Sequence, residues 1–383
     1  MNRLQELIKC GQSYWLDNLA RLKITSGELE RMVREEGLRG VTTNPSIFNK
    51  AISNSDAYDD QIVKLFKEKR PVKEVYEELA VEDVQNACDI MRPVYDKSDG
   101  VDGFVSLEVS PHLANDTGGT MAEARRLFKK VNRENSFIKI PATPEGLPAI
   151  EQMLYEGINI NITLIFSLAT YKAVTDAYIN ALERRVAEGK PVNRIRSVAS
   201  FFLSRIDTLV DGLLSERAAS KIGWDHSFDI NDVMGKAAVA NAKQAYQAFK
   251  RIFSGERWEA LAQKDTMVQR PLWASTSTKN PKYSDVRYVD PLIGRNTVTT
   301  LPEETIAAFA NHGTVAEDSI ESDMENVEKD LIYLKLCGVE MVTVSQRLLD
   351  DGLKRFKNDF DTLLENLTEK KNRIMQDVIV LKG

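Results

Sequence analysis

The chain has 383 residues, of which 43% are hydrophobic, and this is enough apolar material for a large buried core. Charged residues make up 28% and the formal net charge is −6. This acidity argues against a general nucleic-acid-binding protein, which would present a basic surface, but it does not exclude small anionic ligands in a locally positive pocket.

Cysteine content and the N-terminus bear on the compartment. Cys10, Cys88 and Cys337 are far apart and odd in number, so neither a disulfide framework nor a zinc site is indicated, and reduced thiols fit the cytosol. The N-terminal stretch lacks the apolar region of a signal peptide, and no window approaches the ~18 apolar residues that a membrane span requires. We predict a cytoplasmic protein with neither membrane nor nucleic acid as a partner, and the sequence leaves open a homo-oligomer.

Eight short apolar runs alternate with longer helical segments along the chain. They span residues 13–17, 38–44, 102–110, 136–143, 157–166, 196–202, 270–276 and 295–302. Most are continuously apolar, which is typical of strands buried on both faces of a parallel sheet. We interpret a further run at 338–345 as a loop and the start of a helix.

Apolar residues at helical spacing predict helices over 72–91, 168–187 and 233–253, and one or two charged amphipathic helices from Ser345 to about Lys370. Threonine–glutamate pairs with capping-box spacing predict further helix starts. These pairs are Thr25 with Glu28, Thr120 with Glu123 and Thr300 with Glu303.

The alternation predicts an α/β fold, a (β/α)8 TIM barrel with additional N- and C-terminal helices. We expect one domain over residues 1–383, with a helical C-terminal extension from about residue 315. A doubly wound open sheet is the alternative, but no glycine-rich nucleotide fingerprint follows an early strand.

Nearly every predicted strand holds or is followed by a polar residue able to do chemistry. In a barrel the active site lies at the carboxyl ends of the strands, so these side chains are expected to converge. They are Asp17, Asn44, Glu108, Lys139, Asn161, Thr163, Ser200 and Ser275.

Each of these residues also has a structural interpretation. Lys139, in the apolar run "SFIKI", could snorkel from an edge strand, although its desolvated amine could instead attack a carbonyl and form a Schiff base. Glu108 could be a structural carboxylate, and Asp17 could be a helix N-cap. Asn44 precedes a proline and could mark a turn, and Arg205 could be a surface helix residue.

Taken together, the residues suit one chemistry. A Schiff-base lysine needs a proton shuttle, and a carboxylate such as Glu108 could polarise the water that imine formation and hydrolysis exchange. Breaking a C–C bond beside the imine needs a second acid or base, for which Asp17 is the candidate. Neutral asparagine and serine groups can hold sugar hydroxyls, and a cationic pair can hold a phosphate.

Several segments resemble the transaldolase family. "GVTTNPSIF" (40–48) and "FIKIPATPEGLPAI" (137–150) resemble its two signature segments, and "VSLEVSP", "NITLIFS" and "SFFLSRID" match in the same order. The resemblance covers the chain to about residue 310, and the tail resembles a longer subfamily of some bacteria and plants. It implies a (β/α)8 barrel and a Schiff-base mechanism without a cofactor or metal.

The resemblance also implies substrates and roles. Sedoheptulose 7-phosphate and glyceraldehyde 3-phosphate would give erythrose 4-phosphate and fructose 6-phosphate in the non-oxidative pentose phosphate pathway. Lys139 would form the Schiff base, Asp17 would take the C4 hydroxyl proton, and Glu108 and Thr163 would hold water. The expected substrate ligands are Asn44, Asn161 and Ser200 for the three-carbon unit, and Arg205 for phosphate, with Lys279 and Ser275 in place of a second arginine.

Two other functions fit some of these residues. A Schiff-base aldolase on a similar barrel would release the three-carbon unit free, and the two enzymes differ in how well water is kept from the enamine. A barrel that only binds sugar phosphates is the other, but it would have no need of a desolvated amine beside two carboxyl groups.

Overall fold

The computed structural model describes residues 2–220 and 229–380. Its centre is a closed parallel barrel in which eight strands follow one another in chain order and β8 pairs with β1. Each strand overlaps the run predicted for it, and the predicted fold class is confirmed. The strands are β1 (Gln12–Leu16), β2 (Gly40–Val41), β3 (Phe104–Glu108), β4 (Ser136–Pro141), β5 (Ile160–Ile165), β6 (Ser197–Phe202), β7 (Arg270–Ala274) and β8 (Thr297–Leu301).

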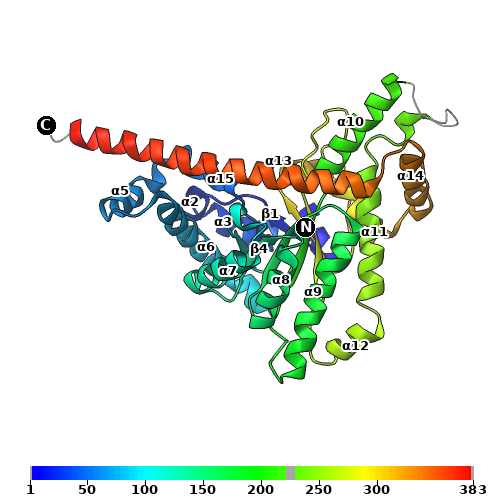
Figure 1. Cartoon of the computed structure of the whole chain (residues 1–383), viewed down its shortest axis with the longest axis horizontal. Helices are drawn as coiled ribbons and strands as arrows, with labels where there is room; N and C mark the ends of the chain where they lie inside the picture. The colour runs from blue at the N-terminus through cyan, green and yellow to red at the C-terminus, as the bar shows by residue number, and fades with distance from the viewer. Residues whose placement is uncertain (1, 221–228, 381–383) are drawn as a thin grey trace.

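Helices surround the barrel, as Figure 1 shows. The helix predicted over 168–187 has those bounds, and the other two predicted helices overlap α6 and α11. Up to β6 the helices are α1 (Arg3–Lys9), α2 (Arg21–Thr25), α3 (Glu28–Arg31), η1 (Met32–Glu36), α4 (Pro45–Ser53), η2 (Asp56–Tyr58), α5 (Asp59–Lys67), α6 (Val72–Lys97), η3 (Pro111–Leu113), α7 (Thr117–Val131), α8 (Gly146–Glu156) and α9 (Leu168–Ala187). After β6 they are α10 (Ser204–Ser220), η4 (Ile230–Asp232), α11 (Ala237–Ile252), α12 (Glu256–Ala262), η5 (Asp290–Leu292), α13 (Glu303–His312), η6 (Ser319–Glu321), α14 (Met324–Leu336) and α15 (Met341–Val380).

The three predicted capping boxes are wrong. Thr25 is the last residue of α2, and Thr120 lies inside α7, whose start is capped by Asp116 through a 2.9 Å bond to the Gly119 amide. Thr300 belongs to β8, where it pairs with β1. For Thr120 a better cap lies upstream, at Asp116, and for Thr300 the pairing of β8 with β1 overrides the local capping motif.

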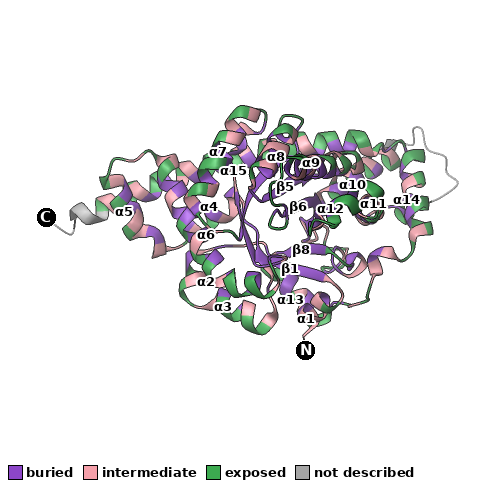
Figure 2. Cartoon of the chain, turned by 90° about the horizontal axis from the view of Figure 1, so that it is seen from below, coloured by how far each residue is buried: buried purple, intermediate pink, exposed green. Residues whose placement is uncertain are grey.

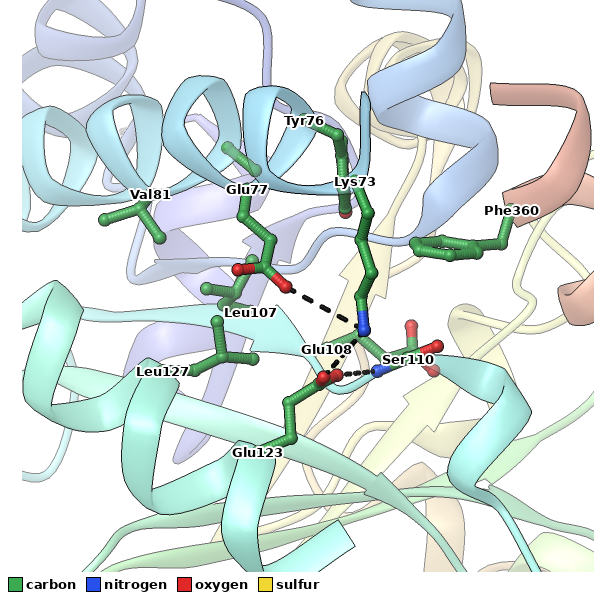
Figure 3. Close-up of a pocket in the computed structure, with 11 residues that line it drawn as sticks. Lys73, Tyr76, Glu77, Val81, Leu107, Glu108, Ser110, Glu123, Leu127 and Phe360 are labelled. Atoms are coloured by element: carbon green, nitrogen blue, oxygen red, sulfur yellow. Dashed lines mark hydrogen bonds and ion pairs between the residues drawn. The ribbon is translucent and has the colours of Figure 1, made fainter. Parts of the chain in front are cut away.

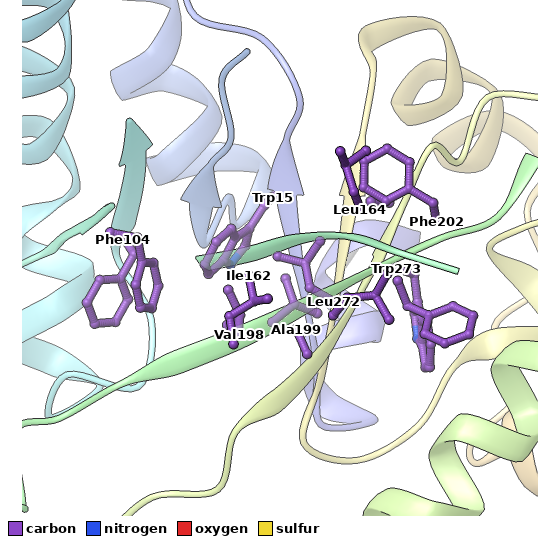
Figure 4. Close-up of a cluster of buried hydrophobic side chains, with 14 of the residues drawn as sticks. Trp15, Phe104, Ile162, Leu164, Val198, Ala199, Phe202, Leu272 and Trp273 are labelled. Atoms are coloured by element: carbon purple, nitrogen blue, oxygen red, sulfur yellow. The ribbon is translucent and has the colours of Figure 1, made fainter. Parts of the chain in front are cut away.

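The residues of the barrel strands are mostly buried, as the colours of Figure 2 show, and Figure 4 shows a cluster of their buried apolar side chains. Within this core the rings of Phe104 and Phe137 stack at 4.3 Å, and Trp15 lies 6.1 Å from Phe137. Gly40 lets β2 approach this layer, because a Cβ there would lie 2.5 Å from the Trp15 ring. Near the amino ends of the strands, Arg270 and Asp102 form a buried ion pair at 2.9 Å.

Helix α15 crosses the carboxyl ends of the strands. It runs the length of the molecule from α14 to α5, as Figure 1 shows, and packs on α4, α5, α6 and α10. The run at 338–345 leads into it, so the predicted loop and helix start are confirmed, and the charged tail forms one helix. In the described part of the chain, no helix is long and apolar enough to cross a bilayer.

Candidate active site at the carboxyl ends of the strands

A cavity of about 1080 Å³ lies between the strand ends and α15. Such a volume accommodates a sugar phosphate, and a cavity at this face of a barrel is the expected place for an active site. Of the residues predicted from sequence, those that line it are Asp17, Asn44, Lys139, Thr163, Ser200, Arg205, Ser275 and Lys279. Glu108 and Asn161 lie immediately behind this lining.

Lys139 is buried on β4, with its side chain 6% exposed. Its Nζ lies 3.4 Å from Oε2 of Glu108 and donates a 3.2 Å hydrogen bond to the Thr43 carbonyl oxygen. Glu108 and Lys139 are register partners on β3 and β4, so the pairing of the strands itself brings amine and carboxylate together. The snorkelling interpretation is therefore wrong, because the amine points into the protein.

Glu108 stands between Lys139 and a second, small cavity of about 10 Å³, about the space of one water molecule. Figure 3 shows this cavity between α6 and α7, where Lys73 lies 2.9 Å from Glu123. Burial raises the pKa of the Glu108 carboxyl group, the positive charge of Lys139 opposes this, and Asp17 adds to the rise. Glu108 is thus suited to accept a proton from the lysine.

Asp17 directly follows β1, and its backbone amide continues the barrel pairing by bonding the Leu301 carbonyl at 2.9 Å. Its Oδ1 accepts a 2.8 Å bond from the Thr42 hydroxyl. Burial raises the pKa of Asp17, while Lys139 and the Thr42 bond lower it. The N-cap interpretation is wrong, because α2 begins only at Arg21. Thr42 was not singled out in the sequence, although it belongs to the quoted "GVTTNPSIF" segment.

Thr163 sits at an irregularity in β5. The register between β5 and β6 shifts between Ile162 and Ile165, and Leu164 has a φ of +61°, a conformation that a bulky residue rarely adopts. The Thr163 hydroxyl is buried without a hydrogen-bond partner and lines the large cavity. Such an oxygen in the wall that also holds Lys139 is suited to bind a water or a substrate hydroxyl.

The amide and hydroxyl residues form a connected set. Ser200 donates a 2.7 Å hydrogen bond to Oδ1 of Asn161, and Nδ2 of Asn161 donates to the Ser106 hydroxyl at 3.0 Å. Asn161 is fully buried, so its amide fixes Ser200 at the cavity wall. Asn44 is the N-cap of α4, where its Oδ1 accepts from the Ile47 amide at 3.1 Å. The asparagine before the proline therefore starts a helix rather than a simple turn.

Three cations lie at one end of the cavity: Arg205, Lys279 and Arg355. Burial lowers the pKa of the Arg205 guanidinium, and the nearby charge of Arg355 lowers it further. Among the described residues, no ion pair joins these three groups to a carboxylate. Ser275, held by a 2.9 Å hydrogen bond to Ser204, stands beside them. The carboxylate of Asp359 acts on Arg205 and Arg355 from the same wall but is not within ion-pair distance of either. A group of cations without direct carboxylate partners suits a phosphate dianion, and the surface interpretation of Arg205 is wrong.

None of the site residues predicted from the sequence lies on α15, whose role as a cover for the barrel the sequence left open. This helix places Leu348, Asp351, Arg355, Phe356 and Asp359 in the wall of the cavity. The signal for a buried face was present, because Phe356, Phe360, Leu363 and Leu367 recur at helical spacing and are buried. What they pack against cannot be read from that spacing. Among the described residues, no group of three or more histidine, cysteine or acidic side chains could hold a metal.

Comparisons with known proteins agree with this geometry. The family described as Transaldolase/Fructose-6-phosphate aldolase matches residues 14–367. A transaldolase of Trichodesmium erythraeum is 46% identical over 97% of this chain and 98% of its own length. A second, named transaldolase 2, from a Nostoc species is 47% identical over 97% and 98%. One from Thiobacillus denitrificans is 44% identical over 96% of this chain and its whole length.

Proposed function

The chain belongs to the transaldolase/fructose-6-phosphate aldolase family, and on that premise we propose that it transfers dihydroxyacetone from sedoheptulose 7-phosphate to glyceraldehyde 3-phosphate. The products are erythrose 4-phosphate and fructose 6-phosphate. The near-full-length match to curated transaldolases makes it a transferase of the pentose phosphate pathway. We propose that the protein is cytoplasmic and that it forms one catalytic domain. Its oligomeric state can be measured by light scattering.

The first step needs a neutral amine. Glu108, with its carboxyl pKa raised by burial, takes a proton from Lys139 across their 3.4 Å separation. The free amine then attacks the ketone carbon of the donor, and loss of water from the carbinolamine gives the Schiff base. Glu108 returns its proton to the departing hydroxyl, while the unpartnered Thr163 hydroxyl orients the water.

Cleavage follows from a second proton transfer. Asp17 takes the proton of the C4 hydroxyl, the C3–C4 bond breaks, and its electrons move into the iminium to form an enamine on Lys139. The aldose phosphate leaves. The Thr42 hydroxyl donates a 2.8 Å hydrogen bond to Oδ1 of Asp17, which orients the carboxylate and stabilises its negative charge. Addition of the enamine to the acceptor aldehyde reverses these steps, and Asp17 gives the proton back.

The phosphate group is held at the far end of the cavity. Arg205 and Lys279 contact it, and Arg355 adds positive charge from α15. Ser200, fixed by Asn161, and Asn44 contact the hydroxyls of the three-carbon unit. These neutral groups orient the unit without neutralising Lys139 or Asp17.

One observation carries the proposal: a buried lysine amine lies 3.4 Å from a buried carboxylate, inside a cavity whose other end is cationic. A protein that only bound sugar phosphates would gain nothing from that amine. Its burial beside Glu108 is the arrangement that allows proton transfer and nucleophilic attack.

Borohydride trapping tests the proposal. We expect that fructose 6-phosphate and borohydride leave a reduced three-carbon adduct on the peptide that contains Lys139 and abolish activity. The Lys139→Arg variant, which keeps the charge but cannot form a Schiff base, should take up no adduct. An active enzyme with no adduct, or with its adduct on another lysine, would show that the mechanism is wrong.

A further inference from the structure

The proposed reaction creates a conflict that the site must resolve, and the inference below rests on it. After cleavage, the enamine on Lys139 has to wait for an acceptor aldehyde. Water competes for the same carbon. One water molecule protonates the enamine carbon, whose electron pair forms the new C–H bond, and the resulting hydroxide adds to the iminium carbon. The C–N bond then breaks, free dihydroxyacetone leaves and the lysine amine is restored.

Phe356 of α15 covers the lysine. Its ring centroid lies 5.8 Å from Nζ of Lys139 and also 5.8 Å from Cζ of Arg205, so the ring lies over both ends of the site. The side chain is 6% exposed and lines the large cavity. The other aromatic residue in that lining is Phe202, whose ring lies 5.4 Å from Arg205. Phe356 therefore supplies apolar surface on the side of Lys139 that faces α15 rather than the strands.

The ring is held in place by the anchoring of its helix. N-terminal to it, Ser345 donates a 3.1 Å hydrogen bond to the Phe166 carbonyl. C-terminal to it, Asp361 bonds His112 at 2.7 Å, and Lys370 lies 2.7 Å from Asp59. Gly352, one turn before Phe356, allows the approach to the barrel, because a Cβ there would lie 3.1 Å from Leu164. The helix thus rests on the strand ends at close range on both sides of the ring.

We propose that Phe356 determines the balance between transfer and release, by keeping water from the enamine on Lys139. An apolar ring offers water no hydrogen bond, so a water molecule near the enamine carbon is disfavoured. An acceptor aldehyde brings its own phosphate to the cationic end of the cavity and enters in spite of this cover. The barrel supplies the amine and the two carboxyl groups, and the added helix makes the enzyme a transferase rather than an aldolase.

The measured quantity is the ratio of two rates. Release is followed as free dihydroxyacetone from fructose 6-phosphate without an acceptor, and transfer as fructose 6-phosphate consumption with erythrose 4-phosphate present. For Phe356→Ala we expect the ratio of release to transfer to rise about tenfold. Phe356→Leu, which remains apolar, should stay close to the unaltered enzyme. Phe356→Gln retains a side chain larger than alanine, but its polar amide can bind water, so it should also raise the ratio.

Leu367→Ala is the matched control. Leu367 is 1% exposed on the same helix, eleven residues beyond Phe356, and lines neither cavity. Its truncation removes buried apolar surface from α15 but leaves the Phe356 ring and the bonds that hold the helix around it in place. The ratio should stay unchanged in this control. An equal rise in Leu367→Ala, or no rise in both Phe356→Ala and Phe356→Gln, would overturn the inference. If Phe356→Ala does not fold, Phe356→Gln decides alone. Borohydride trapping on the unaltered enzyme separates this outcome from failure of the proposed function.

Discussion

Asp207 provides a test of how α10, the helix that carries Arg205, is held against its neighbours. It lies on α10, two residues after Arg205, and is 1% exposed. Its Oδ1 accepts from the Ala238 amide at 2.7 Å and its Oδ2 from the Tyr288 hydroxyl at 2.9 Å. These bonds join α10 to α11 and to the segment between β7 and β8. Burial raises the pKa of Asp207 from 3.8 to about 6, in spite of both hydrogen bonds.

The raised pKa of Asp207 decides how its contribution to stability changes with pH. The native state holds the proton more tightly, so between pH 4 and 6 it binds more protons than the unfolded state. Stability from this group is therefore present at low pH and is lost as pH rises through about 6. A tenfold change in proton affinity is worth about 1.4 kcal/mol, so the difference between 3.8 and about 6 amounts to about 3 kcal/mol.

The Asp207→Asn variant isolates the pH-dependent stability that is due to the Asp207 carboxyl group. Its amide oxygen can accept from Ala238 and its NH2 group can donate to Tyr288, so the variant keeps the shape and remains neutral at every pH. Urea denaturation of both proteins between pH 4 and 8 gives the difference in free energy of unfolding. Relative to the unaltered protein, the variant should gain about 2 kcal/mol between pH 4 and 7, because part of the total of about 3 kcal/mol lies below pH 4. A difference that is flat with pH, or that changes in the opposite direction, would refute the reasoning.

Two further predictions concern Arg205 and the anchoring of α15. Arg205→Ala should raise the KM for phosphorylated donors about 10- to 100-fold, which is the effect of losing a charged hydrogen bond. It should change the turnover of dihydroxyacetone itself little. If steady-state kinetics show equal losses for both substrates, Arg205 does not bind the phosphate. Lys370→Met removes a buried cation that bonds the Ile52 carbonyl at 2.8 Å and pairs with Asp59. It should lower the free energy of unfolding by about 2–3 kcal/mol. Lys354→Met, at an exposed position of the same helix, should change the free energy of unfolding little. Equal denaturation midpoints for the two variants would show that Lys370 does not anchor α15.

The order of the strands could be predicted because it depends on local information. Continuous apolar runs such as "SFIKIP" are typical of buried parallel strands, and eight alternations close most simply as a barrel. Helix starts were less predictable. Thr300 has the spacing of a cap, yet its backbone pairs with β1, and the free energy of closing the barrel outweighs one capping bond.

For the site, the chemical groups present and the order in which they follow the strands could be predicted from the residues alone. Because parallel strands present their carboxyl ends on one face, that order predicted that Lys139 and Glu108 lie near each other, and the pairing of β3 and β4 sets their register. The surroundings of these groups depend on how the barrel and α15 pack together. Burial raises the carboxyl pKa values, Thr42 orients Asp17, and Phe356 lies over Lys139. Each depends on contacts between residues far apart in the chain, which no local pattern encodes.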